Sequence, residues 1–394
     1  GSETLTLSGN GSLTNANVGT NKSVTLNTLS IADGTNGGLA ANYILTGGTH
    51  QLTVVQRIVN ATGTRLYDAT SNADFSDLSL GNLVGLETLV LSGVGTLADK
   101  NVATNKTIGV GTLSTADGAN GGLASNYTLS GGTHLLTINK TTISITGTRQ
   151  YDGSTNALTT NLTLNNLQGG ENLTLSGLGS VSDKNVGNGK TLNITNLSLG
   201  NGSGGTAGVS SNYKFDGGTH QFNITKKNIT FSGSRVYDGT KTISSSDLIT
   251  NDTTSGETVT FSGSGTVSSQ NVQNNQSITV GSIAIVDGTG GGLASNYNLT
   301  TGTFNISQKW VTVSGQRAYD ATNSVNSSDL TVAGEVSGES ILISGIGSIA
   351  DKNVGSGKVI NTTGLSLADG SHSASNYAIG STSFAITRRD VTIS

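Results

Sequence analysis

Regularly recurring aspartates are the side chains in this chain best suited to hold an ion. They form two sets, one directly after a tyrosine and one directly before a glycine: Asp68, Asp152, Asp238 and Asp320, and Asp33, Asp117, Asp287 and Asp369. Calcium takes six to eight oxygen ligands, yet the chain contains no dense Asp-x-Asp-x-Asp run that would supply them. Aspartate in a turn instead accepts hydrogen bonds from its own backbone. We therefore predict turns, with calcium at the first set as the alternative and no other cofactor.

Every tyrosine occupies one of two recurrent positions. One set precedes those aspartates and the other follows an asparagine: Tyr67, Tyr151, Tyr237 and Tyr319, and Tyr43, Tyr127, Tyr213, Tyr297 and Tyr377. Exposed rings could stack on glycans, whereas buried rings need a partner for the hydroxyl. Because a shared core requires identical positions in every copy, we predict buried structural tyrosines.

Arginines and histidines also keep fixed positions. The arginines stand two residues before the tyrosine of each Tyr-Asp pair: Arg65, Arg149, Arg235 and Arg317. We predict a salt bridge to an Asp or Glu of the same repeat, with these glutamates as candidates: Glu87, Glu171, Glu257 and Glu339. His50, His134 and His220 share a position that Phe304 and Phe384 fill in other copies. A position that accepts phenylalanine indicates packing rather than metal ligation.

No group of residues indicates catalysis. Lysines beside asparagines, as at Lys100-Asn101 and Lys184-Asn185, could form isopeptide bonds, but Ala16 and Gln270 replace the lysine in two copies. The chain has no phosphate-binding loop between a strand and a helix, and no Gly-x-Ser-x-Gly elbow with a matching histidine. We predict that the chain is not an enzyme.

Composition narrows the class of protein further. The 394 residues carry a net charge of −4, only 11 % are charged, and cysteine and proline are absent. Nucleic-acid binding needs clustered Lys and Arg, so that class is excluded. No apolar run approaches the ~20 residues that span a bilayer. Several domains of about 100 residues fit this length better than one core.

Three dipeptides recur in one order at intervals of about 84 residues: Tyr-Asp, Asn-Val and Asn-Tyr. The asparagines of the Asn-Val pairs are Asn17, Asn101, Asn185, Asn271 and Asn353. We expect a partial first repeat at 1–55 and complete repeats at 56–139, 140–225, 226–308 and 309–394. Because the first copy lacks its Tyr-Asp segment, we expect a fragment whose targeting segments lie elsewhere.

Alternating apolar residues predict strands within each repeat. Ile143 and Ile145 fall on one face of a segment, as do Leu192 and Ile194, and turn clusters separate such runs. Six to eight short strands per repeat predict a small antiparallel β-sandwich of immunoglobulin-like type. A β-solenoid is the alternative. The joints carry no Gly/Ser spacer, so an all-β tandem array should form a rod on the order of 170–200 Å long at ~3.3 Å per strand residue.

The repeat resembles the YDG domain found in tandem in filamentous-haemagglutinin-like exoproteins. The resemblance rests on Gly147-Thr-Arg-Gln-Tyr-Asp-Gly-Ser-Thr, Gly170-Glu-Asn-Leu-Thr-Leu-Ser-Gly, Ser182-Asp-Lys-Asn-Val-Gly-Asn-Gly-Lys and Ser211-Asn-Tyr. Individual copies depart from it, for example at Ala69 and Ala321, which replace the glycine after Tyr-Asp. The resemblance implies two-partner secretion through an outer-membrane transporter, an extracellular location on the bacterial surface or in the biofilm matrix, and no catalysis.

Our leading hypothesis is a structural stalk of a secreted adhesin or biofilm-matrix protein, which spaces or presents an adhesive region. One alternative is a module that binds host or matrix glycans through many weak sites. Another is a fibre that associates with copies of itself through exposed edge strands.

Overall fold

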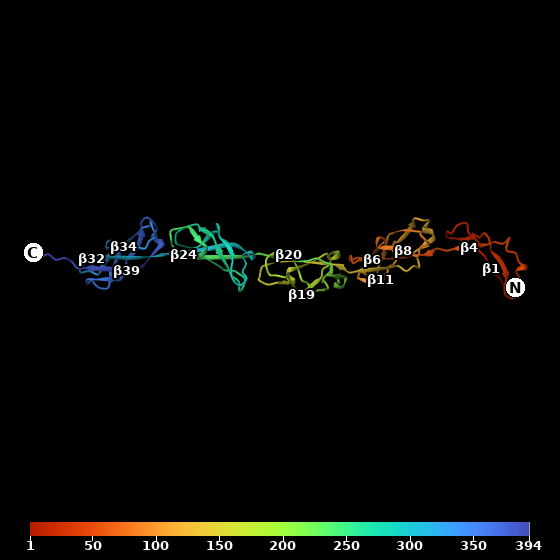
Figure 1. The fold of residues 1–394 in the computed structure, drawn as a ribbon, viewed down its shortest axis with the longest axis horizontal. Coiled ribbons are helices and arrows are strands. Elements are labelled where there is room, and N and C mark those ends of the chain that lie inside the picture. Colours follow the sequence, from red (N-terminus) through yellow and green to blue (C-terminus); the bar gives the residue numbers. More distant parts are fainter. Residues whose placement is uncertain (394) are drawn as a thin grey trace. The chain divides into compact units, whose positions relative to one another are not determined.

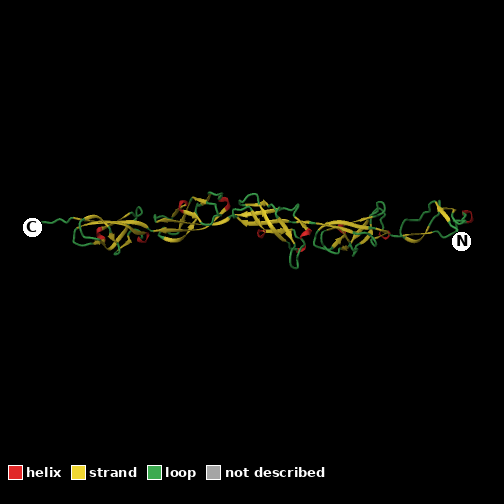
Figure 2. Ribbon diagram, turned by 90° about the horizontal axis from the view of Figure 1, so that it is seen from below, coloured by secondary structure: helices red, strands yellow, loops and turns green. Residues whose placement is uncertain are grey.

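The computed structural model describes residues 1–393, and its regular structure is almost entirely β-strands, joined by loops and 3₁₀ turns (Figures 1 and 2). The last residue of the repeat expected at 309–394 lies outside the described residues. The contacts group into two compact units, one formed by Gly1–Thr146, Leu158–Gly179 and Asn193–His220 and the other by Gly147–Ala157, Ser180–Leu192 and the residues from Gln221 on. The division falls inside the third repeat, so each joint between neighbouring repeats lies within one unit.

The elements are named here by repeat, numbered 1 to 5 in chain order. Repeat 1 contains β1 (Leu5–Ser8), β2 (Gly19–Ser23), β3 (Ser30–Asp33), η1 (Ala40–Asn42) and β4 (Gln51–Val54). Repeat 2 contains β5 (Arg57–Ile58), β6 (Asn60–Leu66), β7 (Asn72–Asp74), η2 (Phe75–Asp77), β8 (Leu78–Gly81), β9 (Leu89–Ser92), β10 (Val94–Thr96), β11 (Ala103–Thr107), β12 (Ser114–Asp117), η3 (Ala124–Asn126), β13 (Tyr127–Thr128) and β14 (Leu135–Asn139). Repeat 3 contains β15 (Thr141–Thr142), β16 (Ser144–Gln150), β17 (Asn156–Leu158), η4 (Thr159–Asn161), β18 (Leu162–Asn165), η5 (Gln168–Gly170), β19 (Thr174–Ser180), β20 (Gly187–Thr191), β21 (Leu197–Gly200), η6 (Ser210–Asn212), β22 (Tyr213–Lys214) and β23 (His220–Thr225).

The last two repeats follow the same order. Repeat 4 contains β24 (Lys227–Val236), β25 (Thr242–Ser244), η7 (Ser245–Asp247), β26 (Leu248–Thr250), β27 (Val259–Ser262), β28 (Ser264–Val267), β29 (Gln273–Thr279), β30 (Ala284–Asp287), η8 (Ala294–Asn296) and β31 (Tyr297–Ser307). Repeat 5 contains β32 (Lys309–Ala318), β33 (Ser324–Asn326), η9 (Ser327–Asp329), β34 (Leu330–Ala333), β35 (Ile341–Ile349), β36 (Gly355–Lys358), β37 (Ile360–Asn361), β38 (Leu365–Asp369), η10 (Ala374–Asn376) and β39 (Tyr377–Thr387). Each helical element within residues 1–393 is a three-residue 3₁₀ turn, and none could cross a membrane.

Each complete repeat is a β-sandwich built around its first and last strands. In repeat 5 one sheet has the order β34-β32-β39-β36, and β35 pairs with β33, β37 and β38 in the other. The long first strand runs antiparallel to β34 but parallel to the long last strand β39. Repeats 2 and 4 have the same parallel pair, β6 with β14 and β24 with β31. The all-β tandem-sandwich prediction is therefore confirmed over the solenoid alternative.

The parallel pair matters for the connection between repeats. In an antiparallel sandwich the neighbouring strands run in opposite directions, but here the first and last strands of a domain run the same way. The chain therefore enters a domain at one end and leaves it at the other. A single residue separates β14 from β15 and β31 from β32, so the joint has no flexible spacer.

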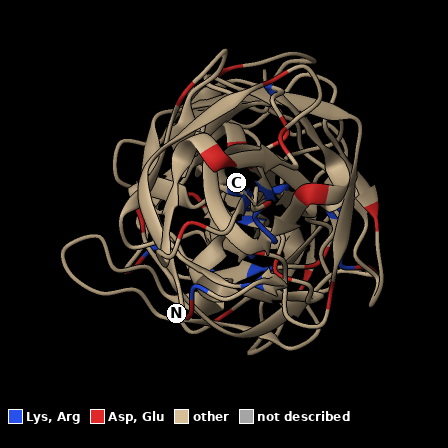
Figure 3. Ribbon diagram, turned by 90° about the vertical axis from the view of Figure 1, so that its left-hand side faces the viewer, with Lys and Arg blue, Asp and Glu red and all other residues tan. Residues whose placement is uncertain are grey.

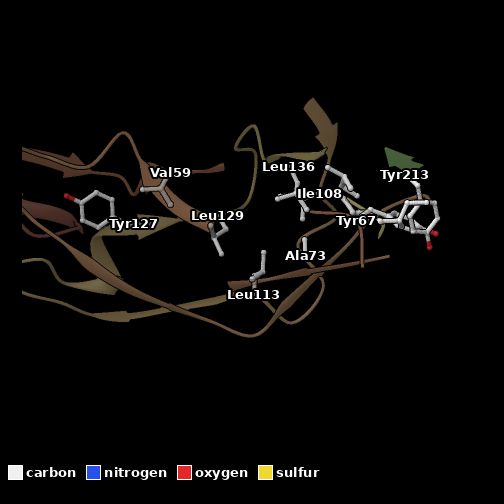
Figure 4. Packing of buried hydrophobic residues seen from close by; sticks show 12 residues of the cluster. Val59, Tyr67, Ala73, Ile108, Leu113, Tyr127, Leu129, Leu136 and Tyr213 are labelled. Carbon is white, nitrogen blue, oxygen red and sulfur yellow. The ribbon is translucent and has the colours of Figure 1, made fainter. Parts of the chain in front are cut away.

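Alternation along the strands produces a small core in each domain. In β14, Leu136 and Ile138 point inward and are fully buried, and they belong to the cluster drawn in Figure 4, which also contains Val59 and Ala73. Side chains alternate between the faces of a strand, so every second residue can remain polar. Charged residues are accordingly sparse along the ribbon (Figure 3).

A glycine in the first strand lets the 3₁₀ turn approach closely. A Cβ on Gly63 would lie 1.8 Å from the carbonyl oxygen of Asp77, and a Cβ on Gly315 would lie 1.9 Å from that of Asp329. Neither contact is possible for an L side chain. This close approach explains why a glycine stands two residues before the arginine of each Tyr-Asp segment.

Candidate functional site: the joints between repeats

The repeat markers meet where one repeat joins the next, rather than inside one core. The Tyr-Asp tyrosine of one repeat packs edge-to-face on the Asn-Tyr tyrosine of the following repeat. Ring centroids lie 5.4 Å apart for Tyr67 and Tyr213, 5.5 Å for Tyr151 and Tyr297, and 5.4 Å for Tyr237 and Tyr377. Figure 4 shows the first of these pairs side by side at one end of the cluster. We number the joints by the repeats they connect, so these are joints 2–3, 3–4 and 4–5.

Seven tyrosines are buried as expected, and two are not. Tyr67, Tyr127, Tyr151, Tyr213, Tyr237, Tyr297 and Tyr377 are each at most 3 % exposed. Tyr43 in repeat 1 is 48 % exposed and donates to Glu3 at 2.7 Å, and Tyr319 in repeat 5 is only partly buried. The prediction of buried tyrosines was therefore wrong for Tyr43 and Tyr319. Six of the buried rings pack in pairs on a tyrosine of a neighbouring repeat, and neither Tyr43 nor Tyr319 has such a partner within residues 1–393; Tyr127 is buried without one.

A buried glutamate links the two tyrosines of each joint. Glu171 accepts hydrogen bonds from the hydroxyls of Tyr67 and Tyr213, both at 2.7 Å. It also forms an ion pair with Lys100. Oε1 faces the preceding repeat and Oε2 faces the glutamate's own repeat. The carboxylate thus has two uncharged donors and one cation, which is what a buried charge needs to be tolerated.

Joint 3–4 repeats this arrangement with equivalent residues. Glu257 accepts from Tyr151 and Tyr297, both at 2.6 Å, and pairs with Lys184. Glutamate side chains in both joints are about as buried as core residues, 4 % exposed for Glu171 and 3 % for Glu257, while the lysines keep about a third of their surface in solvent. The cation therefore approaches from the rim and the tyrosines close the interior.

These contacts shift the titration of the joint residues. Burial alone would raise the pKa of Glu171 and Glu257, but hydrogen bonds from the lysine and both tyrosines outweigh it and lower the pKa of each. The pKa of Tyr151 rises to about 12 because burial and the bond to Glu257 disfavour the tyrosinate. The pKa of Tyr67 and of Tyr213 is raised for the same reasons. Each cluster therefore holds one carboxylate and two neutral hydroxyls at neutral pH.

A second set of hydrogen bonds crosses every joint, between the Asn-Tyr asparagine of one repeat and the Asn-Val pair of the preceding repeat. The fully buried Asn212 of repeat 3 accepts from the backbone N–H of Val102 and donates to the side chain of Asn101, both at 2.9 Å. Equivalent bonds join Val186 and Asn185 to Asn296, Val272 and Asn271 to Asn376, and Val18 and Asn17 to Asn126. Asn101 and Asn185 are thus joint residues. Asn353 donates its backbone N–H to Asp351 at 2.9 Å, as Asn101 and Asn185 do to the aspartate two residues before them.

The Tyr-Asp aspartates are turn residues bound to their own repeat. Asp68 accepts from the backbone N–H and the hydroxyl of Thr70 at 2.9 and 3.0 Å and pairs with Arg65. The same ion pair forms at Asp152, Asp238 and Asp320. Within residues 1–393 no three His, Asp or Glu side chains converge as a metal site would require. Whether calcium binds at these aspartates stays a prediction.

The prediction that each arginine forms a salt bridge within its own repeat is confirmed, but the glutamates named as candidate partners were wrong. Each arginine pairs with the aspartate three residues on, not with a glutamate. The reason is that Glu171, Glu257 and Glu339 already accept from tyrosines at the joints, and Glu87 accepts from Tyr127 at 2.5 Å. The guanidinium also lies over a ring of the last strand, 5.6 Å from the centroid of Phe304 for Arg235. Phe304 and Phe384 face the glycine that Leu136 faces in repeat 2, so the expectation that they fill the histidine position was wrong.

The histidines at that shared position act in packing. His134 is buried, accepts from the backbone N–H of Ala61 at 3.0 Å through Nδ1, and places Nε2 2.8 Å from the carbonyl oxygen of Leu129. His220 and His50 make the equivalent Nε2 contact to Phe215 and Leu45. Both ring nitrogens of His134 are therefore occupied by backbone groups.

These features define a tandem β-sandwich repeat protein whose recurrent residues serve the joints. The family model of the YDG domain matches four consecutive segments, 49–134, 136–220, 223–304 and 305–384. These matches cover most of the chain, so the chain belongs to the YDG-domain family. No curated protein matches it.

Proposed function

We propose that the chain is the structural stalk of a secreted bacterial surface adhesin or biofilm-matrix protein, and that it spaces or presents an adhesive region. The observation that carries this proposal is the joint itself. At joints 2–3 and 3–4 a buried carboxylate, two tyrosines and an asparagine bridge lock one repeat to the next. Domains that move independently of one another would not need such directional contacts between them.

The fold of each repeat supports the same use. Because the first and last strands are parallel, each domain adds length instead of turning the chain back. Proteins made of stacked repeats gain stability from such nearest-neighbour interfaces. The family resemblance supports an extracellular location and export through an outer-membrane transporter.

Small-angle X-ray scattering on the full chain tests the stalk directly. We expect a maximum dimension on the order of 170–200 Å, as for domains extended end to end. Glu257→Ala should loosen joint 3–4 and broaden the distance distribution, while Asp216→Ala, an exposed residue with the same loss of charge, should leave it unchanged. A chain of about half that length, or an indifferent Glu257→Ala variant, would refute a stiff spacer.

A glycan-binding module would need other residues than the tyrosines. Seven of the nine rings are buried in the joints and cannot stack on a sugar. A glycan array with the full chain tests this alternative. Binding that grows with the number of repeats would replace the passive stalk by a multivalent binding function.

Self-association is the second candidate, and the edge strands favour it. The sheet built on the first strand ends at β8 in repeat 2, β26 in repeat 4 and β34 in repeat 5, and none of these strands contains a charged residue or proline. Natural edges are normally guarded by such residues. Ile249, at the centre of β26, is 64 % exposed.

Light scattering against concentration tests the fibre. We expect Ile249→Lys to reduce association and Leu86→Lys, at a more exposed position in a turn, to have no effect. A monomer at every concentration excludes pairing through this edge.

A further inference from the structure

Joint 4–5 differs from the two joints before it in the charge that faces its glutamate. The position of the pairing lysine is Gln270 in repeat 4. Glu339 still accepts from Tyr237 at 2.8 Å through Oε1 and from Tyr377 at 2.5 Å through Oε2, and its side chain is only 6 % exposed. The joint therefore buries the same carboxylate without the lysine that compensates it elsewhere.

A histidine of repeat 5 stands where the lysine charge is missing. The loop after β38 is shorter in repeat 5 than in repeat 2 and brings His372 to the joint. Nε2 of His372 lies 3.8 Å from Oε1 of Glu339, the same oxygen that the lysine contacts in joints 2–3 and 3–4. Nδ1 lies 3.0 Å from the hydroxyl of Ser371. The side chain is 38 % exposed, so it exchanges protons with solvent.

We propose that His372 makes joint 4–5 respond to pH: the protonated imidazole compensates Glu339 and tightens the joint, and the neutral imidazole loosens it. This inference rests on the stalk function proposed above. Histidine is the side chain whose charge ordinarily changes between pH 5 and 8. When repeat 4 covers the carboxylate of Glu339, the carboxylate loses contact with water, and this desolvation costs free energy. The cost is smaller when a cation already faces the carboxylate.

The two tyrosines of this joint stay neutral in that range, and the nearby aspartates already have partners. Burial, followed by the bond to Glu339, raises the pKa of Tyr237 to about 12 and raises the pKa of Tyr377 as well, so both hydroxyls stay neutral. At the end of β38, just before His372 in the same repeat, Asp369 accepts from the backbone N–H of Ala374 at 2.8 Å. From repeat 4, Asp238 is already paired with Arg235. His372 is thus the group at this joint that can switch.

The chain has no cysteine, so spin labels can be placed at will in the full chain. Val286→Cys with Leu342→Cys spans joint 4–5, and Asn188→Cys with Val286→Cys spans joint 3–4, and all three sites are exposed. An ion pair that is partly exposed to solvent changes the ratio of tight to loosened joint about two- to fivefold. We expect the broad component of the distance distribution at joint 4–5 to grow by that factor from about pH 5.5 to about pH 8, the range of histidine titration.

Two variants separate the switch from general effects of pH. His372→Gln should give the broad joint at both pH values, and Gln270→Lys, which restores the lysine, should give the narrow joint at both. An unchanged distribution at joint 4–5 in the native chain overturns the proposal, and so does an equal pH response in His372→Gln. If joint 3–4 is itself broad at both pH values, the stalk function fails instead.

Discussion

Removing one hydroxyl from joint 3–4 should weaken that joint alone. Tyr151→Phe deletes the donor that lies 2.6 Å from Glu257 but keeps the ring, so the edge-to-face contact with Tyr297 remains and no cavity forms. Glu257 also keeps its bond from Tyr297 and its ion pair with Lys184. The lost interaction is a hydrogen bond to a charged acceptor, which contributes about 2 kcal/mol.

The backbone amide of Val186 reports the opening of this joint. It donates to the side chain of Asn296 across the joint at 2.9 Å, so it exchanges with solvent when the two repeats separate. A loss of about 2 kcal/mol corresponds to roughly thirtyfold faster exchange, since every 1.4 kcal/mol is tenfold. Hydrogen-exchange mass spectrometry with fragmentation to single amides measures this in the full chain.

The chain supplies two controls for this experiment. The amide of Val102 makes the same contact at joint 2–3 and should keep its exchange rate in Tyr151→Phe. Tyr319→Phe changes the equivalent tyrosine of repeat 5, whose ring is only partly buried and pairs with no other tyrosine within residues 1–393, and should cost less than about 0.5 kcal/mol. Unchanged exchange at Val186, or equal acceleration at Val102, would refute the account of the joint as a local lock.

Further predictions concern pH, packing and metal. Because the pKa of Glu257 is lowered in the joint, its contribution to stability is present above the ordinary glutamate pKa of about 4.3 and is lost as pH falls. Because the pKa of Tyr151 is raised from 10.0 to about 12, its contribution is complete below pH 10 and is lost as pH rises through about 12; exchange at the joint amides and tyrosinate absorbance follow both limits. Gly63→Ala should cost more than about 2 kcal/mol in thermal unfolding, because the new Cβ would meet the carbonyl oxygen of Asp77, whereas Gly205→Ala, in open space, should stay within about 0.5 kcal/mol. Chelation of calcium should leave the melting temperature unchanged, because the Tyr-Asp aspartates are held by their own turns and arginines, and a lower melting temperature would favour the calcium alternative.

The sandwich could be predicted from the sequence because its signals are local. Alternation places Ile143 and Ile145 on one face, and both are fully buried. Turn residues separate such strands within a few positions of each other. The parallel pairing of the first and last strands could not be predicted in this way, since it joins segments about 70 residues apart and depends on the packing of the whole domain.

The joints could not be predicted because their partners lie in different repeats. Tyr67 and Glu171 are more than one repeat apart in the chain, and each recurs with the same period as every other marker. Periodicity alone cannot distinguish a residue that serves its own core from one that serves the next domain. The sequence did contain one signal that joint 4–5 differs from the others. Gln270 replaces the lysine of joints 2–3 and 3–4 in repeat 4, and a histidine stands at 372 in the following repeat.

The polar character of the joints has a physical consequence for a stalk. An apolar interface would hold two repeats together but would allow rotation or sliding at small cost, because hydrophobic contacts are not directional. Hydrogen bonds have preferred distances and angles, and at joint 2–3 Oε1 of Glu171 and the side chain of Asn212 must both find their donors in repeat 2 at once. A rotated joint would take Tyr67 and Lys100 away from the buried carboxylate, which costs several kcal/mol. We infer that the joint residues fix the angle between successive repeats as well as the attachment, and that the stalk proposed above would depend on this for its stiffness.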